Sequence, residues 1–417
     1  MVARRLAALA WSSAATASLA ACWVPTPAHA QAVSEGVDGA LTLRLLVDRA
    51  WERAARARMA EGRQQEAIAR RLEAQSPFAG APAVTLSSRD DRFAGSSVGA
   101  REHVATLWAP IWLPGQRSAR GALAAADVAQ AEAAALALRL AVAGEVRERI
   151  WLLAATGAEL QLARNRAESS SALQADVARR VQAGDLARAD ALLAQQDSLA
   201  AQALVQDAEL RRNEAALRLE LLAGAQLQGL PDETVGSVDP NGVHPELAAA
   251  RLARESAEQR ARLVGLSRRD PPELGVGYRW DQPTAQVPAG RTVGVSIRIP
   301  LATDARNLPR QAAAQTELDT ALAEERATRD RLDVAVRAAR AALDAQQKVA
   351  ALSAQRVRAA TEREALVRRA FDFGEERLAE LLRAAAAARE AESAAARDQA
   401  ALGLARARLN QALGVLP

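Results

Sequence analysis

The strongest constraint on the fold of this chain is an internal repeat, in which residues of the first half recur in the second half at a constant spacing of 190. The register needs no insertion over more than a hundred residues. A fixed period of this kind indicates two copies of one structural unit. Matched pairs include Pro110 and Pro300, Arg147 and Arg337, Leu153 and Leu343, Gly184 and Gly374, Leu192 and Leu382, and Gly224 and Gly414.

The repeat predicts the organisation of the chain. Residues 31–228 form the first repeat and residues 243–417 the second. Residues 229–242 between them are rich in Gly, Pro and Asp, which is typical of a linker. Residues 1–30 are expected to be a signal peptide that is removed from the mature chain.

Each repeat is expected to contain a helix, two short strands and two very long helices that are broken only at Gly184 or Gly374. At a rise of 1.5 Å per residue, the first long helix of each repeat would be on the order of 100 Å long. The predicted fold class is therefore mainly α with a small β part. The expected helices are 41–75, 117–183 and 185–228 in the first repeat, and 245–268, 310–373 and 375–413 in the second.

The segment 292–301 has the alternation of a strand with one apolar face. Its odd positions are Val293, Val295, Ile297, Ile299 and Leu301, whereas its even positions are Thr292, Gly294, Ser296, Arg298 and Pro300. Weaker alternation is found in 83–89, 104–112 and 273–280. Segments of about 8–10 alternating residues suit tilted transmembrane strands, and on this interpretation the odd residues of 292–301 face lipid. An ordinary β-hairpin packed on a helix is the alternative.

The number of strands predicts self-association. One chain offers four strand segments, whereas a single-chain membrane barrel needs at least about eight strands. A transmembrane β-barrel would therefore be shared between copies of the chain. Three chains would supply twelve strands, which the arithmetic permits without excluding other numbers.

The N-terminus indicates export. Arg4 and Arg5 precede an apolar run over 6–24, and small residues at Ala28 and Ala30 fit cleavage by signal peptidase. A competing cleavage site of the lipoprotein type is formed by residues 19–22, and cleavage there would leave a lipid-modified Cys22 at the mature N-terminus. No later stretch contains the roughly 18 uninterrupted apolar residues of a spanning helix, so a membrane would have to be crossed by strands.

Composition argues against several classes of protein. The chain has 54 Lys plus Arg against 50 Asp plus Glu, and its arginines lie near acids instead of in one cluster, which gives little support to nucleic-acid binding. Its histidines are scattered and it has a single Cys, so neither a metal site nor another cofactor is expected. No convergent set of nucleophile, acid and base was found, and an enzyme is not expected.

The signal peptide, the duplicated unit and the segments Val181–Leu186 and Phe371–Glu376 resemble the TolC-like outer membrane efflux channels over essentially the whole mature chain. The segment Val293–Asn307 is most similar to the CzcC-like branch, which serves heavy-metal efflux systems of the resistance-nodulation-division (RND) type.

This resemblance implies a homotrimer with a twelve-stranded β-barrel in outer membrane lipid and an α-helical barrel in the periplasm. It also implies a periplasmic adaptor (membrane fusion protein) that links the channel to an inner-membrane RND pump. The channel would conduct passively, with heavy-metal cations as the expected cargo. Two alternatives stay open: a periplasmic coiled-coil structural or adaptor protein, and an outer membrane channel for drugs or for type I secretion.

Under this resemblance the breaks at Gly184 and Gly374 are the periplasmic tips of two helical hairpins, because Gly adopts a positive φ at no steric cost. Asp185 and Glu375 are expected at the starts of the return helices, where the helix dipole favours negative charge. The residues predicted to dock the adaptor are Gly184, Asp185, Leu186, Arg188, Gly374, Glu375, Arg377 and Leu378, and the predicted gate acids are Asp372, Glu375 and Glu376. A capping or solvent-facing role is the alternative for the acids.

Overall fold

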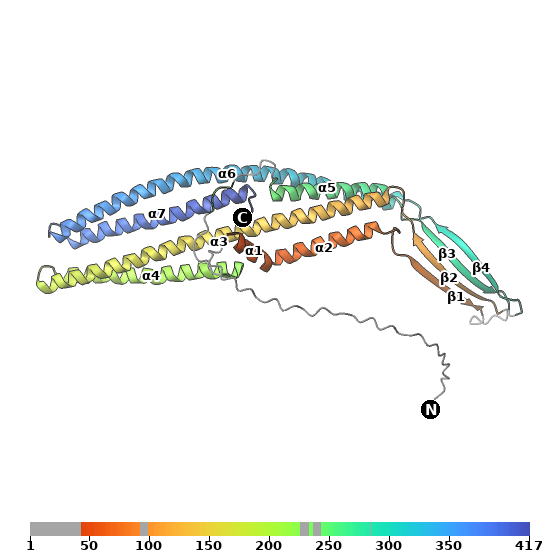
Figure 1. The fold of residues 1–417 in the computed structure, drawn as a ribbon, viewed down its shortest axis with the longest axis horizontal. Helices are drawn as coiled ribbons and strands as arrows, with labels where there is room; N and C mark the ends of the chain where they lie inside the picture. Colours follow the sequence, from red (N-terminus) through yellow and green to blue (C-terminus); the bar gives the residue numbers. More distant parts are fainter. Residues whose placement is uncertain (1–42, 92–98, 226–232, 237–242, 285) are drawn as a thin grey trace, which may run out of the picture. The chain divides into compact units, whose positions relative to one another are not determined.

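Two antiparallel pairs of very long helices make up most of the described part of the chain (Figure 1). The first pair is α3 (Gln116–Ala183) with α4 (Arg188–Ala223), and the second is α6 (Asp304–Asp372) with α7 (Leu378–Ala412). With 68 and 69 residues, α3 and α6 are each about 100 Å long at 1.5 Å per residue. The long helices predicted from the sequence are therefore present.

The structure is a computed structural model that describes residues 43–91, 99–225, 233–236, 243–284 and 286–417. These residues belong to one unit, Ala40–Pro417. The predicted signal peptide, Cys22 and most of the predicted linker lie outside the described residues. The order of a helical segment, two strands and two long helices occurs in both halves, and the repeat boundaries 31–228 and 243–417 stay predictions.

Three shorter helices lie beside the long ones: α1 (Leu43–Arg53), α2 (Ala55–Gln75) and α5 (Pro245–Leu266). The sequence predicted one helix over 41–75, but the chain is extended at Ala54, with φ −71° and ψ 131°. This break lets α1 pack on both α3 and α4, whereas α2 runs along α3. The sequence pattern of 41–75 is helical throughout, but the additional contact of α1 with α4 requires a change of direction at Ala54.

Other helix boundaries also differ from prediction. Helix α6 begins at Asp304 and not near Arg310, and it includes Pro309 in its second turn. A proline this close to the N-terminus removes only one helical hydrogen bond, so the helix continues through it. The return helices α4 and α7 begin three residues later than expected, because the turns at the two hairpin ends are longer.

The helices pack side by side in a definite order. Helix α3 packs on α4 and on α7, and α7 packs on α6. Nearer to the strands, α2 and α5 both pack on α3, and α5 also packs on α6. The order of the four long helices is therefore α4-α3-α7-α6, which leaves α4 and α6 at the two edges.

Alanine at regular spacing brings the paired helices close together. Along α4, every seventh residue from Ala194 to Ala215 is an alanine that is at most 2% exposed. A seven-residue period keeps one side of a helix in contact with its partner as the two coil around each other. Bulky side chains fill the space where α1 joins this pair, at Leu46, Val47, Val142, Val146, Ile150 and Leu219.

Helix α3 alone among the described helices is long and apolar enough, by length and composition, to cross a membrane. The same criteria are met by helices that pack inside soluble proteins. Charged residues such as Asp127, Glu132 and Arg139 interrupt its apolar half, and it packs on five other helices. The composition of α3 therefore does not by itself assign it to a membrane.

The four strands form one antiparallel sheet in the order β1-β2-β3-β4. The strands are β1 (Ala83–Asp90), β2 (Arg101–Pro110), β3 (Glu273–Gln282) and β4 (Gly290–Arg298). The central pair, β2 and β3, joins the first half of the chain to the second, with Leu107 opposite Val276. Strands β1 and β4 are the two edges of the sheet.

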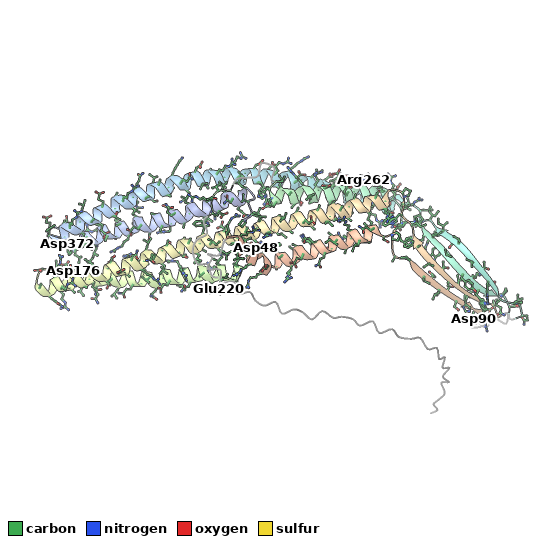
Figure 2. All side chains as sticks on the ribbon, in the orientation of Figure 1. Asp48, Asp90, Asp176, Glu220, Arg262 and Asp372 are labelled. Carbon is green, nitrogen blue, oxygen red and sulfur yellow. The ribbon has the colours of Figure 1, made fainter. Side chains whose placement is uncertain are left out.

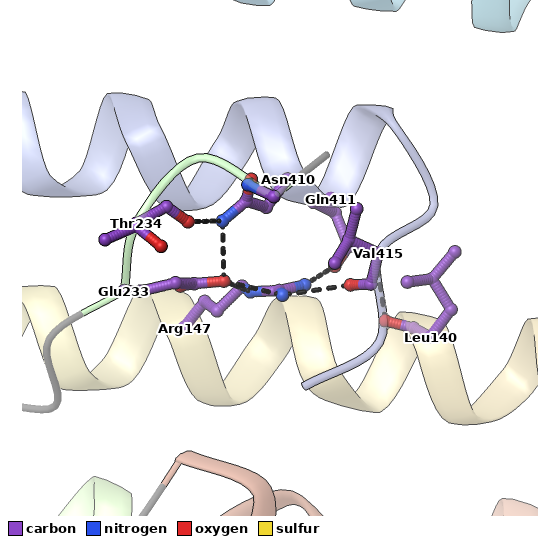
Figure 3. A network of polar contacts seen from close by, with 8 residues as sticks. Leu140, Arg147, Glu233, Thr234, Asn410, Gln411 and Val415 are labelled. Carbon is purple, nitrogen blue, oxygen red and sulfur yellow. Dashed lines mark hydrogen bonds and ion pairs between the residues drawn. The ribbon is translucent and has the colours of Figure 1, made fainter. Parts of the chain in front are cut away.

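A buried polar network holds the linker and the C-terminal segment against α3 (Figure 3). Arg147, which is 2% exposed, donates two hydrogen bonds to Oε1 of Glu233, at 2.7 and 2.9 Å. It also donates to Oε1 of Gln411 at 2.8 Å and to the Val415 carbonyl at 3.0 Å. Asn410 donates to the same Glu233 oxygen at 2.9 Å. One guanidinium thus connects α3, α7, the linker and the C-terminal segment.

We expect Arg147→Ala to lower the free energy of unfolding by about 3–5 kcal/mol, because it leaves the half-enclosed Glu233 carboxylate without its cation. Thermal unfolding of the purified protein would measure this loss. Arg149→Ala is the matched control, since Arg149 is exposed two residues along the same helix and should change stability by no more than about 0.5 kcal/mol. Equal effects of the two substitutions would contradict the role given to Arg147.

Candidate functional site

One face of the sheet is apolar across all four strands. Val84, Leu107, Val276 and Val295 lie directly opposite one another from β1 to β4. A second such row consists of Leu86, Ala105, Tyr278 and Val293, and a third of Ala109, Leu274 and Ile297. Val295 is 73% exposed, and Val84, Leu86, Val293 and Ile297 are exposed to a similar degree. A contiguous exposed apolar surface of this kind marks contact with a membrane or a partner.

The opposite face of the sheet is polar and contains small residues. Thr85, Thr106, Gly277 and Gly294 lie in one row across the four strands. On the same face, Arg279 lies 2.9 Å from Glu102 in an ion pair. The absence of a side chain at Gly275 makes room for the Trp108 ring, since a Cβ there would lie 2.7 Å from it. The predicted alternation thus produces two faces of opposite character.

The predicted lipid-facing row is only partly within the strand. Val293, Val295 and Ile297 lie in β4, but the strand ends at Arg298, so Ile299 and Leu301 lie beyond it. Pro300 explains this difference, because proline has no N–H to donate to a neighbouring strand. The alternation in the sequence continues past the point where hydrogen bonding stops.

The two predicted hairpin tips lie where the long helices reverse. Gly184 ends α3 with φ 89°, and Gly374 follows α6 with φ 78°, both in the left-handed region that favours glycine. The turns are closed by bonds from the Asp185 N–H to the Arg180 carbonyl at 2.9 Å and from the Glu375 N–H to the Ala370 carbonyl at 2.8 Å. Apart from the glycine itself and the residues on either side of it, no described atom of the chain lies within 4 Å of a Cβ built at either glycine.

The acids at the starts of the return helices are not those predicted. Asp185 and Glu375 lie in the turns, ahead of the first helical residue. Asp190 and Glu380 occupy the first turns instead, where negative charge is favoured by the helix dipole. The Asp190 carboxylate also accepts a hydrogen bond from the Ala187 N–H at 3.2 Å. Asp185 and Glu375 are both exposed.

One predicted docking residue, Leu378, is buried. It is 2% exposed and packs with Val177, Phe371 and Leu381 in an apolar cluster between the two hairpins. A partner therefore cannot contact Leu378 in this conformation, because both hairpins cover it. Leu186 is half-buried against the same cluster, whereas Arg188 and Arg377 are exposed.

Arg180 connects the ends of the two hairpins. Its Nη2 donates to Oδ1 of the predicted gate acid Asp372 at 3.2 Å, and its guanidinium lies 5.1 Å from the centre of the Phe371 ring. Asp176 lies one turn earlier on α3 and pairs with the Arg180 Nε at 3.0 Å. Asp176 and Asp372 mark this end of the helices in Figure 2, opposite Asp90 on the sheet. The structure thus gives one of the predicted gate acids a basic partner on the other hairpin.

A second acid joins the hairpins further from the tips. Asp197 on α4 accepts a hydrogen bond from the buried Ser170 hydroxyl of α3 at 2.6 Å. It lies 3.5 Å from Arg166 of α3 and 3.7 Å from Arg389 of α7. Burial lowers the pKa of Arg389, and the nearby Asp197 carboxylate opposes that shift. Sequence reasoning missed Asp197, because its partners are distant in the chain.

Phe373 is a further exposed residue at the tips, and it is not among the residues predicted from the sequence. It directly precedes Gly374 and is 81% exposed, whereas Phe371, two residues earlier, is 3% exposed. Two residues correspond to about 200° around a helix, so the two rings point in opposite directions. The signal that would have found Phe373 is its place in an apolar row that recurs every seven residues along α6.

Within the described part of the chain, no group of three or more His, Cys, Asp or Glu side chains is placed to hold a metal ion. His103 is engaged otherwise: its ring stacks on Trp280 and its Nδ1 lies 3.0 Å from the Ser88 hydroxyl. The candidate functional site thus has two parts. One is the sheet with its apolar and polar faces at one end of α3 and α6, and the other is the pair of hairpin tips at the opposite end.

No family model and no curated protein matches this sequence. Similar solved structures exist, however. The outer membrane protein VceC of Vibrio cholerae is 18% identical, with a TM-score of 0.72 over 89% of this chain and 96% of VceC. CusC, a protein studied for transmembrane channel formation, is 16% identical, with a TM-score of 0.73 over 90% of this chain and 93% of CusC.

A third similar structure is the open state of the outer membrane channel MtrE of Neisseria gonorrhoeae. It is 19% identical, with a TM-score of 0.71 over 89% of this chain and 88% of MtrE. All three are membrane or channel proteins and not enzymes. At these identities the likeness concerns the fold of the single chain. It confirms the predicted mainly α fold with a small β part, which matches the fold of TolC-like outer membrane channels.

Proposed function

We propose that this protein is the outer membrane channel subunit of a tripartite efflux system. The observation that carries the proposal is the two-faced sheet, whose apolar side suits lipid and whose polar side suits a water-filled lumen. Strands of 8 to 10 residues span about 30 Å, which is close to the thickness of the hydrocarbon core. The long helices would extend from this sheet into the periplasm.

The channel would be a homotrimer. The unpaired backbone groups along β1 and β4 need partners, because the bilayer core offers no water to satisfy them. Pairing β4 of one copy with β1 of the next would supply those bonds and close a barrel of twelve strands. These two strands run in opposite directions, so the new pair would be antiparallel like the others.

Transport through this channel would be passive and powered elsewhere. We infer that an inner-membrane RND pump supplies the energy and that a periplasmic adaptor connects it to the exposed tips around Gly184 and Gly374. The fold and the resemblance of the tip segments support these partners. Asp185, Arg188, Glu375 and Arg377 are the exposed side chains available for docking.

Heavy-metal cations are the cargo that we propose. The support is the resemblance of the segment Val293–Asn307 to channels of heavy-metal efflux systems. A channel needs no tight metal site, because conduction requires that contacts with the cargo be weak. Selection of the cargo would belong to the pump and the adaptor.

Deletion of the gene tests this function. We expect the deletion strain to become sensitive to heavy-metal cations but not to uncharged drugs, and the wild-type chain to be recovered from the outer membrane fraction as a trimer in detergent. If the deletion strain is sensitive to drugs but not to metal cations, the proposal of an outer membrane channel stands and the proposal of a heavy-metal cargo is wrong. Recovery as a soluble periplasmic monomer would reject the channel itself.

Substitution at the tips tests adaptor docking. Gly374→Asn keeps a residue that tolerates positive φ and adds a side chain where the chain itself leaves open space. We expect the variant to assemble normally but to lose most metal resistance, because the partner's close approach is blocked. Gln206→Asn is the control, since Gln206 is exposed on α4 away from the tips and lies outside the predicted docking residues. Full resistance with Gly374→Asn would count against docking at this site.

We further propose that the Arg180–Asp372 pair helps to keep the tips closed. Each partly exposed pair contributes only about 0.2–1 kcal/mol, but three copies would act together in a trimer. Glu375 and Glu376, which are exposed beside Asp372, would place additional negative charge at the entrance and attract cations.

Conductance of the reconstituted channel tests this closure. We expect Asp372→Asn to raise the open fraction severalfold, because it removes the charge that pairs with Arg180 and changes the side chain little in size. Exchange of the two charges, by Arg180→Asp with Asp372→Arg, should restore closure. Glu168→Gln serves as the control for the loss of one acid, because Glu168 is exposed on α3 away from the tips. If Asp372→Asn alone and Arg180→Asp alone each leave conductance unchanged, the Arg180–Asp372 pair does not keep the tips closed.

A further inference from the structure

The apolar face of the sheet changes character at its loop end, which is the end away from the helices. Past the apolar rows, Ser88, His103, Trp280 and Arg291 lie opposite one another from β1 to β4, and we call them the loop-end row. Along β3 this row lies about 20 Å from Leu274. A change from aliphatic to aromatic and basic side chains is typical of the level at which a transmembrane sheet leaves the hydrocarbon.

The charged side chains of this face gather at the same end. One step beyond the loop-end row, Arg101 lies opposite Asp90 on β1 and Gln282 on β3. Figure 2 labels Asp90 at this end of the sheet. Among the described strand residues that share the face of Val295, the charged ones are Asp90, Arg101 and Arg291. The helix end of this face therefore has no charge, whereas the loop end is basic.

Arg291 differs from a nearby arginine of the polar face in having no acid partner. Arg279 pairs with Glu102 of the neighbouring strand at 2.9 Å. Arg291 is exposed and lies opposite Trp280, and it forms no ion pair or hydrogen bond with another described residue. A guanidinium at the edge of an apolar face needs polar partners, because the hydrocarbon of a bilayer offers none.

A second basic side chain of the loop-end row is oriented by its neighbours. The His103 ring stacks on Trp280, with ring centroids 5.2 Å apart and planes inclined by 25°. Its Nδ1 lies 3.0 Å from the Ser88 hydroxyl, which leaves Nε2 available to a partner. Strands β2 and β4 are two strand spacings, or about 10 Å, apart, which the long side chain of Arg291 can span. Both side chains can thus contact one group that lies over Trp280.

Arg101 can add to this site from the next row. It is half-buried and lies 3.6 Å from Asp90 in an ion pair, but its Nε forms no hydrogen bond with a described residue. Arg101 therefore keeps a free donor near the loop-end row. A headgroup with more than one anionic group can contact Arg101 and Arg291 together.

The chemistry of the loop-end row fits a phosphate. A guanidinium presents parallel N–H groups in a planar fork, which match two oxygens of a phosphate. The His103 ring supplies a further nitrogen. The Trp280 ring suits the boundary between acyl chains and headgroups, because it is apolar with one polar N–H. An ammonium headgroup would instead be repelled by Arg291.

We propose that the loop-end row binds a phosphate of a lipid headgroup in the outer leaflet, through Arg291 and His103, with the acyl chains of that lipid on the apolar rows. The proposal rests on the proposed outer membrane channel and adds the lipid that its sheet recognises. If the helices extend into the periplasm, the loop end of the sheet lies in the leaflet that faces the outside.

Lipid retention in native mass spectrometry tests this site. The purified oligomer in detergent is mixed with a lipid whose disaccharide headgroup carries two phosphates, or with the same lipid after enzymatic removal of both phosphates. We expect the wild-type protein to retain the phosphorylated lipid severalfold more. Arg291→Gln should lose most of this preference, whereas Arg291→Lys should keep part of it, because the charge remains without the fork.

Arg89→Gln is the matched control. Arg89 is exposed at the same end of the sheet, but it lies on the polar face, opposite Glu102. Its substitution should leave the preference unchanged. Equal retention of both lipids by the wild-type protein, or equal effects of Arg89→Gln and Arg291→Gln, would overturn the proposal. So would break-up of the oligomer by Arg291→Gln without any lipid added, because Arg291 would then serve contacts between copies.

Two further measurements define the ligand. His103→Phe keeps a ring on Trp280 and removes the nitrogens, so it should weaken the preference less than Arg291→Gln does; an unchanged preference would contradict the part given to His103. Excess inorganic phosphate should displace little of the lipid, because the acyl chains contribute to binding. Displacement as complete as the loss with Arg291→Gln would show that the row binds free phosphate and that the lipid is wrong.

These experiments separate failure of the lipid site from failure of the proposed function, since lipid retention is measured without transport. If the phosphorylated lipid is preferred as expected but the protein conducts no ions and gives no metal resistance, the channel is wrong and the lipid site stands. If conductance and resistance are normal but neither lipid is preferred, the lipid site is wrong and the channel stands.

Discussion

Close packing of small side chains between long helices is the interaction on which the rest of this structure depends. Where alanine recurs every seventh residue, as from Ala194 to Ala215, two helices can stay in contact over many turns without a bulky core between them. A helix pair of this kind places its turn far from the strands that precede it. The separation of an apolar sheet from a polar tip, which the proposed function requires, follows from this packing.

Polar contacts then join the two helix pairs. Arg180 reaches Asp372 near the tips, Asp197 lies between α3, α4 and α7 further along, and Arg147 connects α3 with the C-terminal segment. Ion pairs also lie within each helix pair, as between Arg164 and Glu209, and an apolar cluster around Leu378 lies between the pairs. Apolar and charged contacts thus act together both within and between the two pairs.

Much of the site was predictable because it depends on local rules. The turns at Gly184 and Gly374 follow from a conformation that glycine favours, and Val293, Val295 and Ile297 share a face because side chains alternate along a strand. The failures concern positions where neighbours decide. Leu378 was expected at the surface, but the hairpins close over it.

The sequence by itself determined the repeat, the long helices, the positions of the turns and the two faces of the sheet, because periodicity and backbone conformation act over a few residues. Only the tertiary structure decided that the helix over 41–75 breaks at Ala54, that Asp372 has a basic partner and that Leu378 is buried between the hairpins. These features depend on contacts between segments that are distant in the chain. Their geometry is set by the packing of whole helices, which no local pattern contains.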